Sequence, residues 1–223
     1  MRTLAILPVK SFGAAKQRLM PALGAGSRQA LARAMFSDVL ASLQRVESLE
    51  AVAVVTADPD AEAAARGGRA LVLRDTAQAG QSAAASTGIE HAVAEGFERV
   101  LLVPGDTPLL DPAEVESLLA IPRAVSIVPD RHGTGTNALV LSPPDAIAPS
   151  FGPGSLKRHV AAAKAAGVTS AVEEIPTLML DVDTGDDLSA LRAALAKRPG
   201  GAPATRGALR DLERPRGQRA VPA

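Results

Sequence analysis

The 223-residue sequence predicts an α/β fold, a doubly wound sheet with helices on both faces. Short apolar runs typical of buried strands alternate with longer segments in which apolar residues recur at helical spacing. The clearest run, residues 100–103, stops abruptly at Pro104, Gly105 and Asp106, as a buried parallel strand does at its carboxyl end. The chain is long enough for one domain with a full core, or at most two small ones.

The first half of the chain has the most regular alternation. Its clearest helix follows Ser27, a common capping residue, because Leu31, Met35, Val39 and Leu43 recur every four residues. The expected elements are strands over 4–9, 51–56, 70–73 and up to 103, and helices over 27–46, 61–65 and 81–94.

The second half has clear helix starts and a less regular rhythm. Asp111, Pro112 and Glu114 combine a cap, a proline at the first helical position and an acid at the third. Thr184 caps another helix, and Asp187 three residues later completes a capping box. The other expected elements are strands over 124–128, 138–141 and 177–182 and a helix over 155–166.

The segment beyond about Lys197 differs in composition from the rest. It is rich in Pro, Gly, Arg and Ala and has no apolar period. We therefore expect a single domain over 1–196 and a disordered tail over 197–223.

Composition excludes several classes of function. Lys plus Arg and Asp plus Glu balance at 24 each, so the chain lacks the basic field expected for a nucleic-acid partner. Cysteine is absent, and the three histidines, at 91, 132 and 159, show no metal-ligand spacing and are interpreted as surface or supporting residues. Without Trp or Tyr, a site that stacks a base between aromatic rings is not expected. No signal peptide or membrane-spanning run is found, so we expect a cytoplasmic protein that does not bind membranes.

Asp106 is the first candidate site residue. It follows a predicted central strand, and ligands of open α/β sheets bind at the carboxyl ends of the strands. On this segment alone, a turn aspartate that caps its own backbone is an equally good interpretation.

A basic loop follows the first predicted strand. Lys10, Lys16 and Arg18 lie within nine residues of one another, and cations beside exposed backbone amides can hold a polyphosphate. A solvated run of charges is the alternative.

Two further carboxylates, Asp181 and Asp183, lie two residues apart at the end of a predicted strand. In extended geometry they project to one face, where they could share a cation with Asp106. Carboxylates and phosphate oxygens are the ligands that Mg²⁺ prefers. Each acid alone could instead be a turn or capping residue.

Two loops rich in small residues follow, one containing Thr136 and Asn137 and the other running from Phe151 to Ser155. The second places backbone amides and a serine hydroxyl at the start of a predicted helix, with Lys157 and Arg158 behind them, which suits a second anion. The alternative is a structural loop with a capping serine.

Five motifs occur in an order that resembles a known family. They are Pro8-Val-Lys-Ser-Phe through Lys16-Gln-Arg-Leu19, Pro104-Gly-Asp-Thr-Pro108, Gly135-Thr-Asn137, Phe151-Gly-Pro-Gly-Ser155 and Leu180-Asp-Val-Asp-Thr184. As a set spanning about Met1 to Leu195, they resemble the 2-phospho-L-lactate or phosphoenolpyruvate guanylyltransferase family of coenzyme F-420 biosynthesis.

The resemblance implies a nucleotidyltransferase-A fold, with a mixed, mostly parallel, Rossmann-like sheet. It also implies transfer of GMP from GTP to a small phosphorylated three-carbon acid, which is phosphoenolpyruvate in the bacterial members. The implied partner is a downstream transferase that accepts the activated product. The implied roles are Mg²⁺ binding by Asp106, Asp181 and Asp183, contact with the GTP phosphates by Lys10, Lys16 and Arg18, catalysis by Lys10, Lys16 and Asp106, and acid binding by Thr136, Gly152 and Ser155.

The sequence departs from the family at the guanine-contacting segment. Relatives often have Gly-Leu-Asn where this chain has Gly80-Gln81-Ser82. Gly80 and Ser82 are therefore the nucleotide-binding candidates here, with the Ser82 hydroxyl in place of an amide that both donates and accepts.

Two alternatives stay open. Other nucleotidyltransferases, such as molybdenum cofactor guanylyl- or cytidylyltransferases, usually have a Leu-Ala-Gly-Gly type of loop after the first strand, and residues 8–13 lack it. A non-catalytic nucleotide-binding protein is expected to lose the acidic cluster, which is complete here.

Overall fold

The computed structural model describes residues 1–14 and 16–213 and has one seven-stranded sheet, in the order β3-β2-β1-β4-β6-β5-β7. The strands are β1 Thr3–Val9, β2 Ala51–Thr56, β3 Leu71–Arg74, β4 Arg99–Leu102, β5 Val125–Pro129, β6 Thr136–Leu141 and β7 Ser170–Val172. The predicted α/β fold, with a mixed and mostly parallel sheet, is confirmed.

Strand direction decides which loops meet at one edge of the sheet. β1 pairs in parallel with β2 and β4, whereas β6 runs antiparallel to both β4 and β5. The amino end of a reversed strand lies beside the carboxyl ends of its neighbours. Thr136, at the start of β6, is therefore at the same sheet edge as Asp106, which follows β4.

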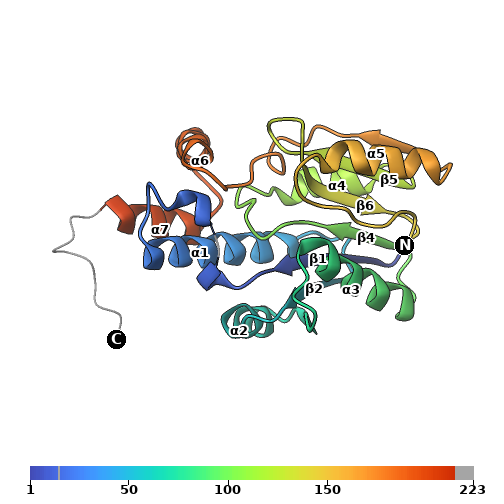
Figure 1. The fold of residues 1–223 in the computed structure, drawn as a ribbon, viewed down its shortest axis with the longest axis horizontal. Helices are drawn as coiled ribbons and strands as arrows, with labels where there is room; N and C mark the ends of the chain where they lie inside the picture. The colour runs from blue at the N-terminus through green and yellow to red at the C-terminus, as the bar shows by residue number, and fades with distance from the viewer. Residues whose placement is uncertain (15, 214–223) are drawn as a thin grey trace.

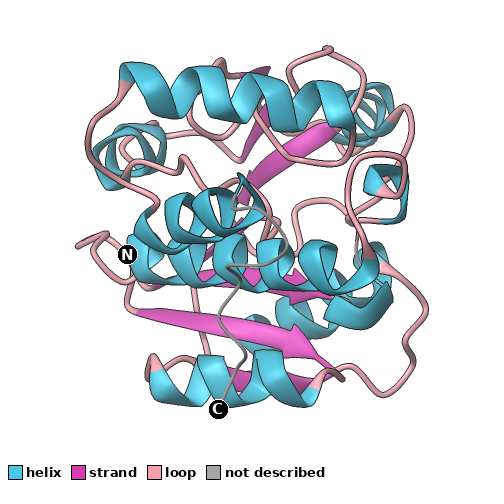
Figure 2. Ribbon diagram, turned by 90° about the vertical axis from the view of Figure 1, so that its left-hand side faces the viewer, coloured by secondary structure: helices cyan, strands magenta, loops and turns pink. Residues whose placement is uncertain are grey.

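Helices cover both faces of the sheet, and in Figure 2 strands run between them. The helices are α1 Ala25–Leu43, α2 Pro59–Gly67, α3 Gln81–Ala94, α4 Pro112–Leu119, α5 Ser155–Ala165, α6 Gly185–Lys197 and α7 Pro203–Glu213, with short 3-10 turns at Phe12–Ala14 and Gln17–Leu19. Alternate β1 residues enter two cores, because successive side chains of a strand point to opposite faces. Ala5 and Leu7 pack with α1, α2 and α4, and Leu4 and Ile6 pack with α3 and α5.

Helix α3 lies close to β1 because it has a glycine at the crossing. A Cβ atom at Gly88 would lie only 2.5 Å from Ile6 Cγ2. This glycine brings α3, and with it the α3 amino terminus, against the centre of the sheet.

Two predictions for individual elements are wrong. Helix α1 begins at Ala25 with Gly24 at the cap position, so Ser27 lies inside the first turn and caps nothing. Residues 177–182 form no strand: the alternating apolar residues there are buried, but the amide of Leu178 bonds to Ile175 O in a turn. Apolar residues at alternate positions indicate which side chains are buried, but they do not require the segment to pair with another strand. The short edge strand β7 was not predicted.

The predicted tail is also wrong for residues 203–213, which form α7. Figure 1 shows α7 lying along α1, and Leu209 joins a third core with Met35 of α1 and Leu191 of α6. Asp38 of α1 caps α7 from a distance: its carboxylate accepts hydrogen bonds from the amides of Ala204, at 3.1 Å, and Thr205, at 2.7 Å. No local pattern reveals a cap 166 residues away in sequence. The rest of the predicted tail beyond 213 lies outside the described residues.

Over residues 1–14 and 16–213, the structure contains no helix that is both long enough and apolar enough to cross a membrane.

Replacing Asp38 with alanine tests whether α7 belongs to the cooperative fold. Asp38→Ala leaves one buried and one part-buried amide without an acceptor, so we expect the free energy of unfolding to fall by about 1 to 3 kcal/mol in urea denaturation. The matched control is Ser37→Ala, at an exposed neighbour on the same helix. Equal stability of the two variants would contradict the capping role.

Candidate active site

A cavity of about 690 Å³ opens at the sheet edge where β1 and β4 end and β6 begins. Ten predicted site residues line it, namely Lys10, Lys16, Arg18, Gly80, Asp106, Thr136, Gly152, Ser155, Asp181 and Asp183. Ser82 is not among the described residues that line it. The loops singled out from the sequence therefore meet around one cavity.

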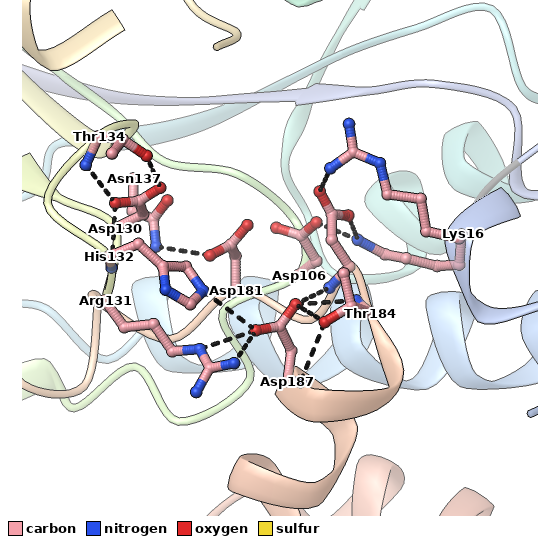
Figure 3. Close-up of polar contacts among 12 residues, drawn as sticks. Lys16, Asp106, Asp130, Arg131, His132, Thr134, Asn137, Asp181, Thr184 and Asp187 are labelled. Carbon is pink, nitrogen blue, oxygen red and sulfur yellow. Dashed lines mark hydrogen bonds and ion pairs between the residues drawn. The ribbon is translucent and has the colours of Figure 1, made fainter. Parts of the chain in front are cut away.

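Lys16 stands at the centre of the cavity. Its ammonium group contacts Asp106 and donates a hydrogen bond of 2.9 Å to Asp183 Oδ1 (Figure 3). Burial alone would lower the pKa of Lys16, but the charges of Asp106 and Asp183 raise it above its ordinary value. The backbone at Lys16 is left-handed, with φ of 57°, a conformation that costs free energy in any residue with a side chain. A charged and strained lysine thus links the β1 loop to the carboxylates.

Asp106 and Asp181 carry more negative charge than the site offsets. Figure 3 shows their carboxylates pointing toward one another. Asp106 Oδ1 is buried and has no hydrogen-bond partner among residues 1–14 and 16–213. Burial, followed by the charge of Asp106, raises the pKa of Asp181 to about 6, even though Asn137 Nδ2 donates a hydrogen bond of 3.1 Å to Asp181 Oδ1. The site therefore has room for additional positive charge.

The predicted three-carboxylate metal site is not assembled in the structure. Among residues 1–14 and 16–213, no three His, Asp or Glu side chains are arranged so that they could hold a metal ion. The reason is that Lys16 Nζ lies between Asp106 and Asp183. The chemistry of the donors still suits a hard cation, since they are carboxylate oxygens, one of them unpaired.

The turn that carries Asp183 is held by Asp187, at the start of α6. Asp187 Oδ2 accepts hydrogen bonds from the amides of Asp183, at 3.1 Å, and Thr184, at 2.8 Å. Arg131 Nε donates to Asp187 Oδ1 at 2.7 Å. The predicted capping box is thus confirmed, and it also fixes the backbone at the centre of the cavity.

The other two cations of the basic loop lie at the rim. Lys10 follows the end of β1 and is exposed, and Arg18 is also exposed, with one nitrogen 3.9 Å from Asp183 Oδ2. Both line the cavity, so they can approach an anion bound there.

The β3 and α3 end of the cavity contains a residue that the sequence analysis missed. Asp75 directly follows β3, lines the cavity and is largely buried, and its Oδ1 accepts a hydrogen bond of 2.9 Å from the amide of Gln78. The strand-end rule that singled out Asp106 also applies to Asp75. Gly80 lies nearby with φ of 106°. Ser82 has a different role: its Oγ accepts a 2.8 Å hydrogen bond from the amide of Phe151.

The β6 and α5 end contains hydroxyl groups around a buried histidine. Thr136 Oγ1 lies 2.9 Å from Nδ1 of His159, and the amide of Ser150 donates to Nε2 of the same ring at 2.9 Å. His159 is fully buried, and burial followed by the charge of Arg158 lowers its pKa to about 4. Ser155 lines the cavity, and its Oγ is buried without a hydrogen-bond partner in the described part of the chain. His159, predicted from the sequence to be only a surface or supporting residue, is thus a buried residue beside the cavity.

Arg158 of α5 holds the loop before this helix in place. Arg158 Nε donates to Ser150 Oγ at 2.8 Å, and Arg158 Nη2 donates to Ser150 O at 2.8 Å and to Phe151 O at 3.1 Å. Arg158, expected to support an anion at the start of this helix, fixes the loop and is not among the described residues that line the cavity. Gly152 and Gly154 have positive φ values of 104° and 72°, which the loop requires.

Comparison with known proteins agrees with this geometry. Residues 3–193 match the family described as guanylyl transferase CofC like. A phosphoenolpyruvate guanylyltransferase of Conexibacter woesei is 52% identical over 218 residues, which cover 96% of this chain and 98% of that protein. A 2-phospho-L-lactate guanylyltransferase of Methanothermobacter thermautotrophicus is 34% identical and is covered to 83%, with 84% of this chain aligned.

A solved structure supports the fold. A protein of Desulfovibrio desulfuricans G20, provisionally assigned as a nucleotide-diphospho-sugar transferase, superposes with a TM-score of 0.78 over 96% of each chain. The two sequences are only 18% identical, so this likeness concerns the architecture alone.

The buried His159 predicts a pH dependence of stability. Between pH 6.5 and 4 the unfolded chain binds a proton at this histidine that the folded chain does not bind, so stability falls as the pH falls through this window. From pH 7 to pH 5, we expect His159 to lower the free energy of unfolding by about 2 kcal/mol.

Urea denaturation of the wild type and of His159→Gln at the two pH values measures this contribution. The difference between the proteins isolates His159, because Asp181 acts in the opposite direction in both: its pKa is raised to about 6, so its contribution to stability is lost as the pH rises. Parallel pH profiles for the two proteins would contradict a buried, neutral His159.

Proposed function

The chain belongs to the guanylyl transferase CofC-like family, and we propose that it transfers GMP from GTP to a small phosphorylated three-carbon acid, with release of pyrophosphate. Phosphoenolpyruvate is the acid we favour, since the relative that carries this name shares 52% of its aligned residues with the chain. The alternative acid is 2-phospho-L-lactate, after the relative of 34% identity.

The order of groups along the cavity is the observation that carries this proposal. Asp75 and Gly80 line the end next to β3 and α3, Lys16 and Asp106 lie above β1 and β4, and Ser155 lies at the α5 end. This order fits a nucleoside at one end, its phosphates in the centre and the acid at the other end. The acceptor phosphate and the α-phosphate of GTP would then meet near Lys16.

The reaction needs little activation of the nucleophile. A phosphate monoester has a second pKa near 6 and is mostly dianionic at pH 7. One of its oxygens attacks the α-phosphorus of GTP, a new P–O bond forms as the bond to the β-phosphate oxygen breaks, and pyrophosphate leaves with that oxygen. No side chain has to remove a proton, which agrees with the neutral, hydrogen-bonded state of His159.

The chain contributes mainly positioning and positive charge. Two anionic substrates repel one another, and the cations that offset this repulsion are Lys10, Lys16 and Arg18. Lys16 is the most strongly held of the three, since its side chain is only 8% exposed. At the acid end, the buried Ser155 Oγ can donate to a carboxylate or a phosphate.

We also propose that Asp106, Asp181 and Asp183 hold Mg²⁺. The unpaired Asp106 Oδ1 and the surplus negative charge around Asp181 support this role. When bound, Mg²⁺ would neutralise phosphate charge and stabilise the leaving pyrophosphate.

The product of this reaction would be an activated diphosphate diester, in which a new P–O–P linkage joins GMP to the phosphate of the acid. We propose that a downstream transferase accepts it in coenzyme F-420 biosynthesis, and that the reaction takes place in the cytoplasm. The family resemblance supports the pathway.

The proposed activity is tested by incubating the purified protein with GTP, Mg²⁺ and one acid at a time, and measuring pyrophosphate. Phosphoenolpyruvate, 2-phospho-L-lactate and 3-phospho-D-glycerate are the three acids. We expect rapid release with phosphoenolpyruvate and little with GTP alone. No release with any acid would overturn the assignment.

Asp106 is expected to be essential for turnover. Asp106→Asn keeps the shape of the side chain and removes its charge, so we expect kcat to fall by at least about a hundredfold. Asp145→Asn is the matched control, because Asp145 is exposed and outside the cavity lining. Near-normal turnover of Asp106→Asn would contradict the mechanism.

Asp75 is expected to select guanine. Guanine presents two adjacent donors, N1–H and the 2-amino group, and a carboxylate can accept from both. We expect the wild type to prefer GTP over inosine triphosphate, which lacks the 2-amino group, by at least about tenfold in kcat/KM. Asp75→Asn, which can still accept from the amide of Gln78, is expected to reduce this ratio to nearly one. An unchanged ratio would place guanine recognition elsewhere.

A further inference from the structure

We propose that His159 is a positioning residue that orients the Thr136 hydroxyl so that its proton points into the acid-binding end of the cavity. This inference rests on the proposed function, because it assigns that end of the cavity to the phosphorylated acid. It gives the histidine a role through Thr136 and not through contact with the substrate.

The two hydrogen bonds of the ring determine which nitrogen carries the proton. The amide of Ser150 can only donate, and it lies 2.9 Å from Nε2, so Nε2 must present a lone pair. A neutral imidazole carries a single proton, which is therefore on Nδ1. Nδ1 lies 2.9 Å from Thr136 Oγ1 and donates to it.

The opposite tautomer would place two donors face to face. With the proton on Nε2, the N–H of Ser150 would point at the N–H of the ring inside a fully buried site. A charged ring would create the same conflict. Burial and the neighbouring charge of Arg158 also favour the neutral ring, with a pKa lowered to about 4.

The Thr136 hydroxyl then has one remaining direction for its proton. Its oxygen accepts from Nδ1, and in the described part of the chain it has no other hydrogen-bond partner. Thr136 lines the cavity, so the cavity is where an acceptor can lie. A hydroxyl that could otherwise accept or donate is thus restricted to donating into this space.

Ser155 indicates which kind of ligand group the Thr136 hydroxyl would bind. Ser155 also lines the cavity, and its buried Oγ has no partner among the residues that the structure describes. Ser155 and His159 are one turn apart on α5, so one face of the helix carries both the serine hydroxyl and the ring that sets Thr136. Two hydroxyls that can donate at one end of the cavity suit a ligand group that has only acceptors. Carboxylate and phosphate are such groups, whereas a hydroxyl or an amine brings a competing donor.

The ring is held so that it cannot turn. Phe151 makes an edge contact with it, with centroids 5.3 Å apart and planes at 72°. The Phe151 amide is in turn fixed by Ser82. The orientation of Thr136 is therefore set before any substrate arrives.

The first test is ¹⁵N NMR of the histidine rings in the full-length wild-type protein at pH 7. The sequence has three histidines, so His91→Gln and His132→Gln assign the His159 signals by elimination. We expect a neutral ring with the proton on Nδ1. A proton on Nε2, or a charged ring, would overturn the proposal.

The second test compares two variants that each keep one half of the ring. His159→Asn keeps a donor at the position of Nδ1, and His159→Gln keeps an acceptor at the position of Nε2 that still pairs with Ser150. If His159 acts through Thr136, His159→Gln raises the KM for the acid by about tenfold or more and leaves the KM for GTP within about twofold. His159→Asn recovers most of that loss. His91→Asn is the histidine control, outside the cavity lining.

A merely structural role predicts the reverse order, since His159→Gln preserves the bond that holds the loop. That order, or equal effects on both substrates, would overturn the proposal. In a Thr136→Val background, His159→Gln should have no further effect on the KM for the acid. Failure of the proposed function is distinguishable: it would appear as no pyrophosphate release by the wild type, whereas failure of this inference would appear in an active enzyme or in the wild-type NMR spectrum.

Discussion

The cavity depends on the ion pairs that the ammonium group of Lys16 makes with Asp106 and Asp183. This ammonium group joins a loop after β1 to Asp106 after β4 and to Asp183 before α6, three segments that are far apart in sequence. Without it, carboxylates gathered at one sheet edge would repel one another; burial and then the charge of Asp106 already raise the pKa of Asp181. The same positive charge that holds the cavity together is what a triphosphate would require. Under the proposed function, one group would therefore serve both stability and ligand binding.

The reversed direction of β6 divides the cavity into two ends. In a purely parallel sheet, the residues at the start of β6 would lie at the opposite edge from Asp106. Because β6 is antiparallel, Thr136 and Asn137 join the carboxyl ends of the parallel strands, and α5 can place Ser155 beside them. Under the proposed function, the parallel half of the sheet would serve the nucleotide and the mixed half would serve the acid.

The sequence predicted those features that depend on local pattern. Strands such as residues 51–56 and the capping box at Thr184 are determined by neighbouring residues, and they were found. Asp181 lines the cavity although residues 177–182 form no strand. Its place in the cavity therefore agrees with the family motif and not with the strand geometry first expected for it. Asp75 follows a strand as Asp106 does, so the strand-end rule is enough to predict it from the sequence. The environment of His159 could not be predicted, because its partners come from β6 and from the loop before α5.

The contact between Asp38 and α7 also affects how the chain is made. A ribosome synthesises α1 more than a hundred residues before the amides of Ala204 and Thr205 that pair with Asp38. Until α7 emerges, this carboxylate must stay hydrated, and the apolar face of α1 around Met35 has no complete cover. The nascent protein therefore exposes an apolar surface of α1 until the helices that cover it have been synthesised. Chaperones that recognise apolar helices have their longest opportunity to bind there.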